Sequence, residues 1–301
     1  MTVSVVISVR NGEKFIAETI RSILAQGDCV TEVIVVDDQS TDNTGPAALS
    51  VGDSRIRVIA ASRRGLPAGR NCGVEVATGQ WLYFIDADDL VRPGALAALL
   101  AAAASVPKAG LVYGDYDRIA HDGGNFGRRR HLMRFRRKPS GDVLERMVQN
   151  NFMVIGAQIV RRTVYDRCGG FDESLKVCDD WQFWCKAAAV TDFLFVPGLY
   201  VMSYRVHDTS IMHTKPLPFE AFLPGVNSVF GHPLIAGRLD QAKLQRFRKR
   251  SEASHMSYIA SIAVRLKAYD TAVKMLMRSM VRAPSTAPKN LVQFAGAFVG
   301  L

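Results

Sequence analysis

The stretch Tyr83-Phe84-Ile85-Asp86-Ala87-Asp88-Asp89 decides the fold of this chain, because an apolar run ends there abruptly in three carboxylates. About fifty residues earlier, Val35-Val36-Asp37-Asp38-Gln39-Ser40-Thr41-Asp42 has the same form. In α/β proteins, ligands bind at the carboxyl ends of the strands. The two stretches therefore predict an active-site edge on a sheet.

The triplet Asp86-Ala87-Asp88 suits a hard divalent cation, which prefers oxygen ligands. Mg²⁺ or Mn²⁺ held there would neutralise a nucleotide diphosphate. A second interpretation stays open, in which Asp88 or Asp89 only caps a helix that begins near Pro93.

Strand and helix patterns alternate around these stretches. This alternation predicts an α/β fold with a mostly parallel sheet covered by helices on both faces. We expect strands at residues 3–9, 32–36, 56–60, 81–85, 110–115 and 155–160, and helices at residues 13–26, 70–77, 94–104 and from about 179.

Five blocks of sequence stand out, at residues 3–14, 35–44, 68–73, 86–89, and 168–173 with 179–181. In order and spacing over about residues 3–210, they resemble the family 2 glycosyltransferases of GT-A fold. The resemblance implies a Rossmann-like GT-A domain and transfer of a sugar with inversion at its anomeric carbon. The implied donor is a nucleotide-diphosphate sugar, a UDP-sugar first, and the acceptor is a hydroxyl of a glycan or glycolipid.

The resemblance also implies roles for single residues on the donor side. The family's usual Pro-x-Tyr-Asn reads Ser8-Val9-Arg10-Asn11 here, so the stacking aromatic is absent and Arg10 is expected to lie on the base instead. The residues implied to bind substrate are Ser8, Arg10, Asn11, Glu13, Asp38, Arg70, Asp86, Ala87, Asp179 and Arg205. Asp88 and His207 are implied to bind Mn²⁺ or Mg²⁺.

On the acceptor side, Asp179-Asp180 stands where the family has Glu-Asp, and Asp180 corresponds to the catalytic base. A single displacement needs one carboxylate to take the acceptor proton. We expect Asp180 to be exposed with a pKa near 4, and so ionised at pH 7. The alternative is that both carboxylates only cap the helix that runs through Trp181.

Positive charge is concentrated in the C-terminal part of the chain, whose net charge is +10. Residues 1–120 carry 11 basic and 14 acidic side chains, whereas residues 121–301 carry 27 and 14. Such clusters attract polyanions, so we expect peripheral contact with an anionic membrane rather than nucleic-acid binding; a solvated loop and helix face is the alternative. The clusters are Arg128, Arg129, Arg130, Arg134, Arg136, Arg137 and Lys138, and Lys243, Arg246, Arg248, Lys249 and Arg250.

Four prolines between residues 216 and 233 indicate a linker. We therefore expect a catalytic domain at residues 1–215, with a nucleotide-sugar half at 1–120 and an acceptor half at 121–215. Residues 216–301 would form the linker and a helical extension of two antiparallel helices with a break near residues 267–270.

The longest apolar stretch, residues 95–106, is shorter than the roughly 20 residues that a membrane-spanning helix needs. The first residues also lack the basic start and cleavage site of a secretory signal. We expect a cytoplasmic protein, at most peripheral at the inner face of the membrane.

Two other classes of protein stay open. A nucleotidyltransferase also uses a metal and carboxylates beside a nucleotide, although residues 8–14 lack the Gly-rich basic loop typical of that class. A non-catalytic polyanion-binding module would account for the two basic clusters.

Overall fold

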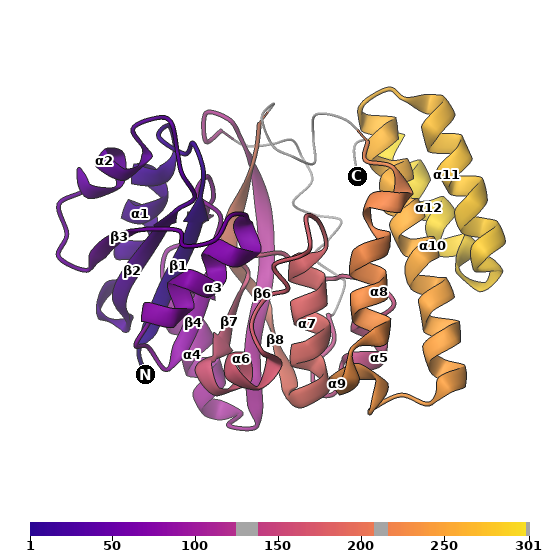
Figure 1. Ribbon diagram of the computed structural model, residues 1–301, viewed down its shortest axis with the longest axis horizontal. Helices are drawn as coiled ribbons and strands as arrows, with labels where there is room; N and C mark the ends of the chain where they lie inside the picture. The colour runs from indigo at the N-terminus through magenta and orange to yellow at the C-terminus, as the bar shows by residue number, and fades with distance from the viewer. Residues whose placement is uncertain (125–137, 208–215, 299–301) are drawn as a thin grey trace.

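The computed structural model describes residues 1–124, 138–207 and 216–298, and they form an eight-stranded sheet in the order β3-β2-β1-β4-β7-β6-β8-β5 (Figure 1). The strands are β1 Val3–Val9, β2 Val30–Asp37, β3 Ile56–Ala60, β4 Trp81–Phe84, β5 Leu90–Val91, β6 Ala109–Ala120, β7 Gln158–Arg161 and β8 Asp192–Val206.

Helices cover both faces of this sheet. The first seven are α1 Ile16–Leu24, α2 Thr44–Leu49, α3 Leu66–Val76, α4 Ala95–Ser105, α5 Leu144–Met147, α6 Arg162–Cys168 and α7 Asp179–Val190. The C-terminal five are α8 Leu223–Gly231, α9 Pro233–Ala236, α10 Gln241–Arg265, α11 Tyr269–Arg282 and α12 Ala287–Phe298.

The N-terminal half of the sheet is parallel, since β1 pairs with β2 and β4, and β2 pairs with β3, all in parallel. Every residue of β1 is buried, as expected for a strand that has helices on both faces. Helices α1 and α4 pack on one face, and α3, α6 and α7 pack on the other. Strands β5 and β7 run antiparallel to their neighbours, so the sheet is mixed.

The sequence patterns do not predict β8, because Pro197 and Gly198 interrupt its apolar run and read as a turn. In the structure, the pairing of β8 with β6 shifts register at this point, from Phe195 beside Tyr113 to Tyr200 beside Asp115. The strand then continues to Val206, and its end brings His207 to the carboxyl edge of the sheet.

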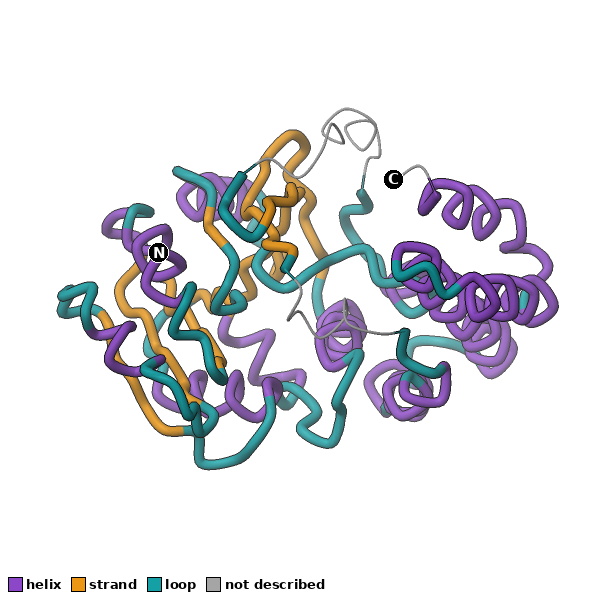
Figure 2. The backbone as a smooth tube through the Cα atoms, turned by 90° about the horizontal axis from the view of Figure 1, so that it is seen from above, coloured by secondary structure: helices purple, strands orange, loops and turns teal. Residues whose placement is uncertain are grey.

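The C-terminal helices stand beyond α7, at the side of the molecule away from β3 (Figures 1 and 2). Helices α10 and α11 are separated at residues 266–268, as predicted, and α12 follows them. Phe230 of α8 and Phe247 of α10 share a core with Trp184 of α7, whereas the second half of α10 forms a separate core with α11. The domain boundary near residue 216 therefore stays a prediction. None of the helices described is long and apolar enough to span a membrane.

Phe247 offers a test of how closely the extension is joined to the catalytic part. Its side chain is 2% exposed in the core that it shares with α7, so Phe247→Ala should lower the free energy of unfolding by about 3–5 kcal/mol. The matched change Val281→Ala, at a side chain that is 78% exposed on α11, should cost no more than about 0.5 kcal/mol. Urea unfolding measures both. Equal effects of the two substitutions would contradict this packing.

Candidate active site

The donor side begins where β1 meets the start of α3. Ser8 is buried at the end of β1, and its Oγ has no hydrogen-bond partner among the described residues. A Cβ at Gly69 would lie 2.1 Å from this oxygen, so only glycine allows α3 to approach β1 so closely. The hydroxyl of Ser8 is thus buried against α3, and its contact with a nucleotide stays a prediction.

Asn11 and Glu13 hold the loop that follows β2. Asn11 adopts a left-handed backbone conformation with φ of 56°, and its Oδ1 accepts a hydrogen bond of 2.8 Å from the Thr41 backbone N–H. Glu13 accepts from the backbone and the side chain of Asn43 at 3.1 and 3.0 Å. Both residues thus shape the pocket wall, and their direct contact with a donor stays a prediction.

Arg10 and Asp38 lie on the same side of the site. The side chain of Arg10 is exposed, as stacking on a base would require. Asp38 is buried and its Oδ2 accepts from the Gly65 backbone N–H at 2.9 Å, just before α3 begins. Their predicted contacts with the base are not tested by this geometry.

Arg70 joins the donor side to the acceptor side. Its guanidinium, 5% exposed, donates to Asp86 Oδ1 at 3.0 Å and to Asp179 Oδ2 at 2.5 Å. The guanidinium also lies 5.4 Å from the ring centroid of Phe171. The carboxylates raise the pKa of Arg70 despite its burial, so its positive charge is permanent.

Asp88 and His207 form the predicted metal-binding pair. Asp88 Oδ2 and His207 Nε2 are 2.7 Å apart, although 119 residues separate them in the chain. Burial and the nearby Asp86 raise the pKa of Asp88, and His207 opposes this shift. Over the described ranges, no group of three His, Cys, Asp or Glu side chains is arranged to hold a metal by itself. Ala87, which is predicted to bind the donor, accepts a hydrogen bond of 2.8 Å at its backbone oxygen from Thr19 Oγ1.

Arg205 is buried beneath this pair. Its side chain donates to the carbonyl oxygens of Asp88 and His121 at 2.8 and 3.0 Å, and to the Glu18 carboxylate at 2.7 Å. Its backbone N–H donates to Asp89 at 2.9 Å. Arg205 therefore holds the Asp88 loop in place, and its direct contact with a diphosphate stays a prediction.

Asp180 lies in the first turn of α7, which begins just after Cys178, a residue with φ of 65°. Its carboxylate accepts from the Trp181 backbone N–H at 2.6 Å and from Asn151 Nδ2 at 3.3 Å. Burial first, and then the charge of Asp179, raise the pKa of Asp180 to about 6. The expectation of an exposed carboxylate with a pKa near 4 is therefore wrong, because the sequence does not show what packs over it.

The second basic cluster is mostly engaged within the protein. Lys243 pairs with Glu145 at 2.8 Å, Arg248 pairs with Glu252 at 3.1 Å, and Arg250 donates to Gln149 at 3.0 Å. This geometry favours a helix face that packs on the catalytic part. In the first cluster, residues 128–137 lie outside the described residues, and Lys138 pairs with Asp115 at 3.1 Å.

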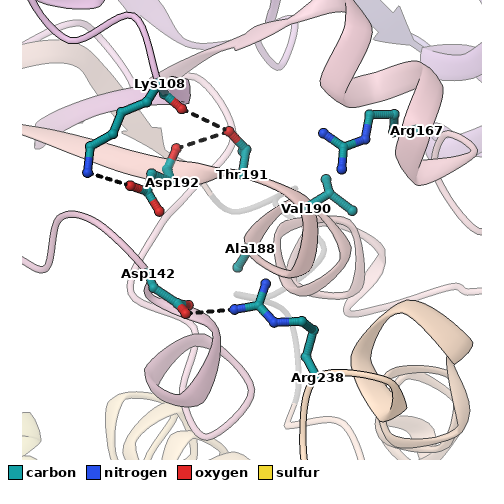
Figure 3. Close-up of a pocket in the computed structure, with 8 residues that line it drawn as sticks. All are labelled: Lys108, Asp142, Arg167, Ala188, Val190, Thr191, Asp192 and Arg238. Atoms are coloured by element: carbon teal, nitrogen blue, oxygen red, sulfur yellow. Dashed lines mark hydrogen bonds and ion pairs between the residues drawn. The ribbon is translucent and has the colours of Figure 1, made fainter.

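A hollow of about 330 Å³ lies at the other end of α7, near Val190 (Figure 3). Four of its five charged side chains are paired with one another, Lys108 with Asp192 at 3.0 Å and Asp142 with Arg238 at 2.7 Å. The length of α7 separates this hollow from Asp180, so it is not part of the predicted catalytic site.

The chain is similar in sequence to known glycosyltransferases. Residues 4–169 match the family described as Glycosyl transferase family 2. The succinoglycan biosynthesis protein ExoO of Rhizobium meliloti is 30% identical over 267 residues, which cover 86% of this chain and 76% of that protein. Glycosyltransferase GlyG of Streptococcus pneumoniae is 34% identical over 127 residues, which cover 41% of this chain and 42% of that protein.

Solved structures show the same fold. S. aureus TarS residues 1–349 in complex with UDP-GlcNAc superposes with a TM-score of 0.70 at 19% identity, covering 99% of this chain and 89% of that one. The mannosyltransferase PcManGT of Pyrobaculum calidifontis, in complex with GDP-Man and Mn²⁺, gives a TM-score of 0.59 at 19% identity, covering 99% and 80%. These matches confirm the predicted GT-A fold with its C-terminal helices.

The chain belongs to glycosyl transferase family 2, and it is a glycosyltransferase. This membership excludes the nucleotidyltransferase and the non-catalytic module that the sequence left open.

Arg70 allows a direct test of the link between the two sides of the site. Arg70→Gln leaves Asp86 and Asp179 without their shared cation and should lower the free energy of unfolding by about 2–3 kcal/mol, with loss of transfer. Arg63 is a matched control, since it also bridges two carboxylates, Glu75 and Glu173, but is 44% exposed. Arg63→Gln should cost no more than about 1 kcal/mol by denaturant unfolding and should keep activity. The link would be refuted if Arg70→Gln were as stable and active as Arg63→Gln.

With Asp180 as the predicted base, its raised pKa predicts a pH dependence for transfer. A base must be deprotonated, so kcat/KM should rise as pH increases through about 6 and then level off. Asp180→Asn should lose about a hundredfold or more in transfer rate and should lack this rise. A pH–rate profile of both proteins measures this, and an unchanged profile in Asp180→Asn would contradict the assignment.

Proposed function

We propose that this protein is an inverting glycosyltransferase that moves a sugar from a nucleotide-diphosphate sugar to a hydroxyl of a glycan or glycolipid. The observation that carries the proposal is the junction at Arg70. One cation there holds a donor-side carboxylate, Asp86, and the start of the helix that bears Asp180.

Asp180 acts as the general base in this proposal. It accepts the proton of the acceptor hydroxyl as that oxygen bonds to the anomeric carbon and the bond to the nucleoside diphosphate breaks. Its pKa of about 6 keeps it ionised at neutral pH while making it a better proton acceptor than an ordinary aspartate. Asp179 cannot take this role as readily, because its carboxylate is held by Arg70.

The donor pocket is formed by Ser8, Arg10, Asp38 and Asp86, with Asn11 and Glu13 shaping its wall. A UDP-sugar is the proposed donor. The fold match to TarS, which was solved with UDP-GlcNAc and with UDP, supports this choice. PcManGT was solved with GDP-Man, so a GDP-sugar is the second candidate.

A divalent cation, Mn²⁺ or Mg²⁺, is proposed as the cofactor. Asp88 and His207 supply one carboxylate oxygen and one imidazole nitrogen, a pair that leaves positions for the diphosphate oxygens of a donor. When bound, the ion would offset the charge of the leaving diphosphate. Arg205 and Asp89 keep the Asp88 loop in the shape that this pair requires.

The acceptor class is proposed from the relative ExoO, whose name places it in succinoglycan biosynthesis. We accordingly propose addition of a sugar to an extracellular or surface polysaccharide precursor. Peripheral contact with the inner face of a membrane would bring the enzyme to such a precursor. We also propose that residues 1–215 form the catalytic unit and that a helical extension follows it.

The metal pair is tested by Asp88→Asn. The change replaces a charged oxygen ligand by a neutral one, so it should abolish nearly all transfer while the protein stays folded. Asp28→Asn, at an exposed aspartate far from the site in sequence, is the control and should keep full activity. Full activity in excess EDTA, or an active Asp88→Asn, would refute the metal role.

Thermal shift with UDP and GDP sugars in Mn²⁺ or Mg²⁺ identifies the donor by the ligand that stabilises the wild type.

A further inference from the structure

We infer that Ser254 of α10 is a positioning residue for Asp180, which it reaches through the side chains of Asn150 and Asn151. The C-terminal extension thereby completes the active site instead of only following it. The inference rests on the proposed function, because Asp180 is the general base only in that proposal.

Two side chains of α10, one helical turn apart, contact consecutive residues just after α5. Arg250 Nη1 donates to Gln149 Oε1 at 3.0 Å. Ser254 Oγ donates to Asn150 Oδ1 at 2.6 Å. Residues four positions apart share one face of a helix, so this face of α10 holds the segment that leads to Asn151.

A series of hydrogen bonds continues from Asn150 to Asp180. Because Asn150 accepts from Ser254 through its Oδ1, its Nδ2 is left to donate, and it does so to the Asn151 backbone oxygen at 3.0 Å. The Oδ1 of Asn151 accepts from the Met153 backbone N–H at 3.0 Å. This contact sets the orientation of the Asn151 amide, whose Nδ2 donates to Asp180 Oδ2 at 3.3 Å.

The last of these hydrogen bonds bears on the direction of the carboxylate. Asp180 Oδ1 accepts from the Trp181 backbone N–H at 2.6 Å, whereas Oδ2 accepts from Asn151. Two hydrogen bonds on different oxygens restrain the rotation of the carboxylate about its Cβ–Cγ bond. A general base acts only when it is aligned with the proton that it takes, so this restraint favours transfer.

His255, the residue after Ser254, holds α10 against the residues on either side of the acidic pair. Its ring lies 4.8 Å from the ring of Trp181, and its Nε2 lies 3.6 Å from Cys178 Sγ. The Nδ1 lies 2.9 Å from the Ser251 backbone oxygen, which can only accept, so Nδ1 carries the proton and Nε2 accepts from the thiol. Burial lowers the pKa of His255, which keeps the ring neutral at pH 7.

The test is the pKa of Asp180 in the full-length protein, measured by NMR titration of its carboxyl carbon. This measurement needs neither donor nor acceptor, and Asp180→Asn assigns the signal. Asn151→Ala should raise the pKa of Asp180 from about 6 to about 7, because a hydrogen bond that favours the ionised form is lost. Ser254→Ala should raise it by roughly half as much. The double variant should have the same pKa as Asn151→Ala alone, since Ser254 acts through Asn151.

Two further variants separate positioning from a loosened helix. Ser254→Thr keeps a hydroxyl and should restore the wild-type pKa of Asp180. Ser261→Ala is the matched control on the same helix, because its hydroxyl donates within α10, to the Ser257 backbone oxygen at 3.0 Å, and the pKa should not change. The titratable groups that bear on Asp180 are the same in all these variants, namely Arg70, Asp179, Cys178, Cys185 and Tyr258.

An unchanged pKa of Asp180 in Ser254→Ala would overturn the inference. So would additive shifts in the double variant, or an equal shift in Ser261→Ala. The proposed function fails separately: if Asp180→Asn transfers sugar at the wild-type rate, Asp180 is not the base, whatever the titration shows.

Discussion

The site depends on the ion pairs of Arg70. Three carboxylates, Asp86, Asp179 and Asp180, approach one another at the sheet edge, and their mutual repulsion would separate the donor side from α7. A buried guanidinium with a rigid fork can bind two of them at once, which a lysine cannot do with the same geometry. Arg70 thus ties the first turn of α7, which carries Asp180, to the donor side.

The same contact places two adjacent carboxylates in different environments. Asp179 is held by Arg70, whereas Asp180 accepts hydrogen bonds from an amide and a backbone N–H, and its pKa is raised to about 6. Neighbouring groups with different environments can take different roles, one structural and one catalytic. Cys178, which has a left-handed backbone conformation, directly precedes α7, so the helix begins with these two carboxylates.

Much of the fold could be predicted from local patterns. The buried strands 3–9, 30–37 and 81–84 show as apolar runs that end in polar residues, and the sequence blocks identified the family. The resemblance implies that Asp88 and His207 both bind a metal; their side chains lie 2.7 Å apart, and metal binding by them stays a prediction. Strand β8 could not be predicted, because a Pro-Gly pair inside a strand is read as a turn unless its partner strand is known. Asn151, whose side chain donates to Asp180, comes from a distant part of the chain, so no local signal shows the burial that raises the pKa of Asp180.

With Asp180 as the general base, transfer is a single displacement at the anomeric carbon, which inverts its configuration. Proton NMR of the freshly formed glycosidic bond, recorded with the donor that thermal shift selects, gives the anomeric coupling and so the configuration of the product. The product should have inverted configuration relative to the donor. A product of retained configuration would contradict a single displacement.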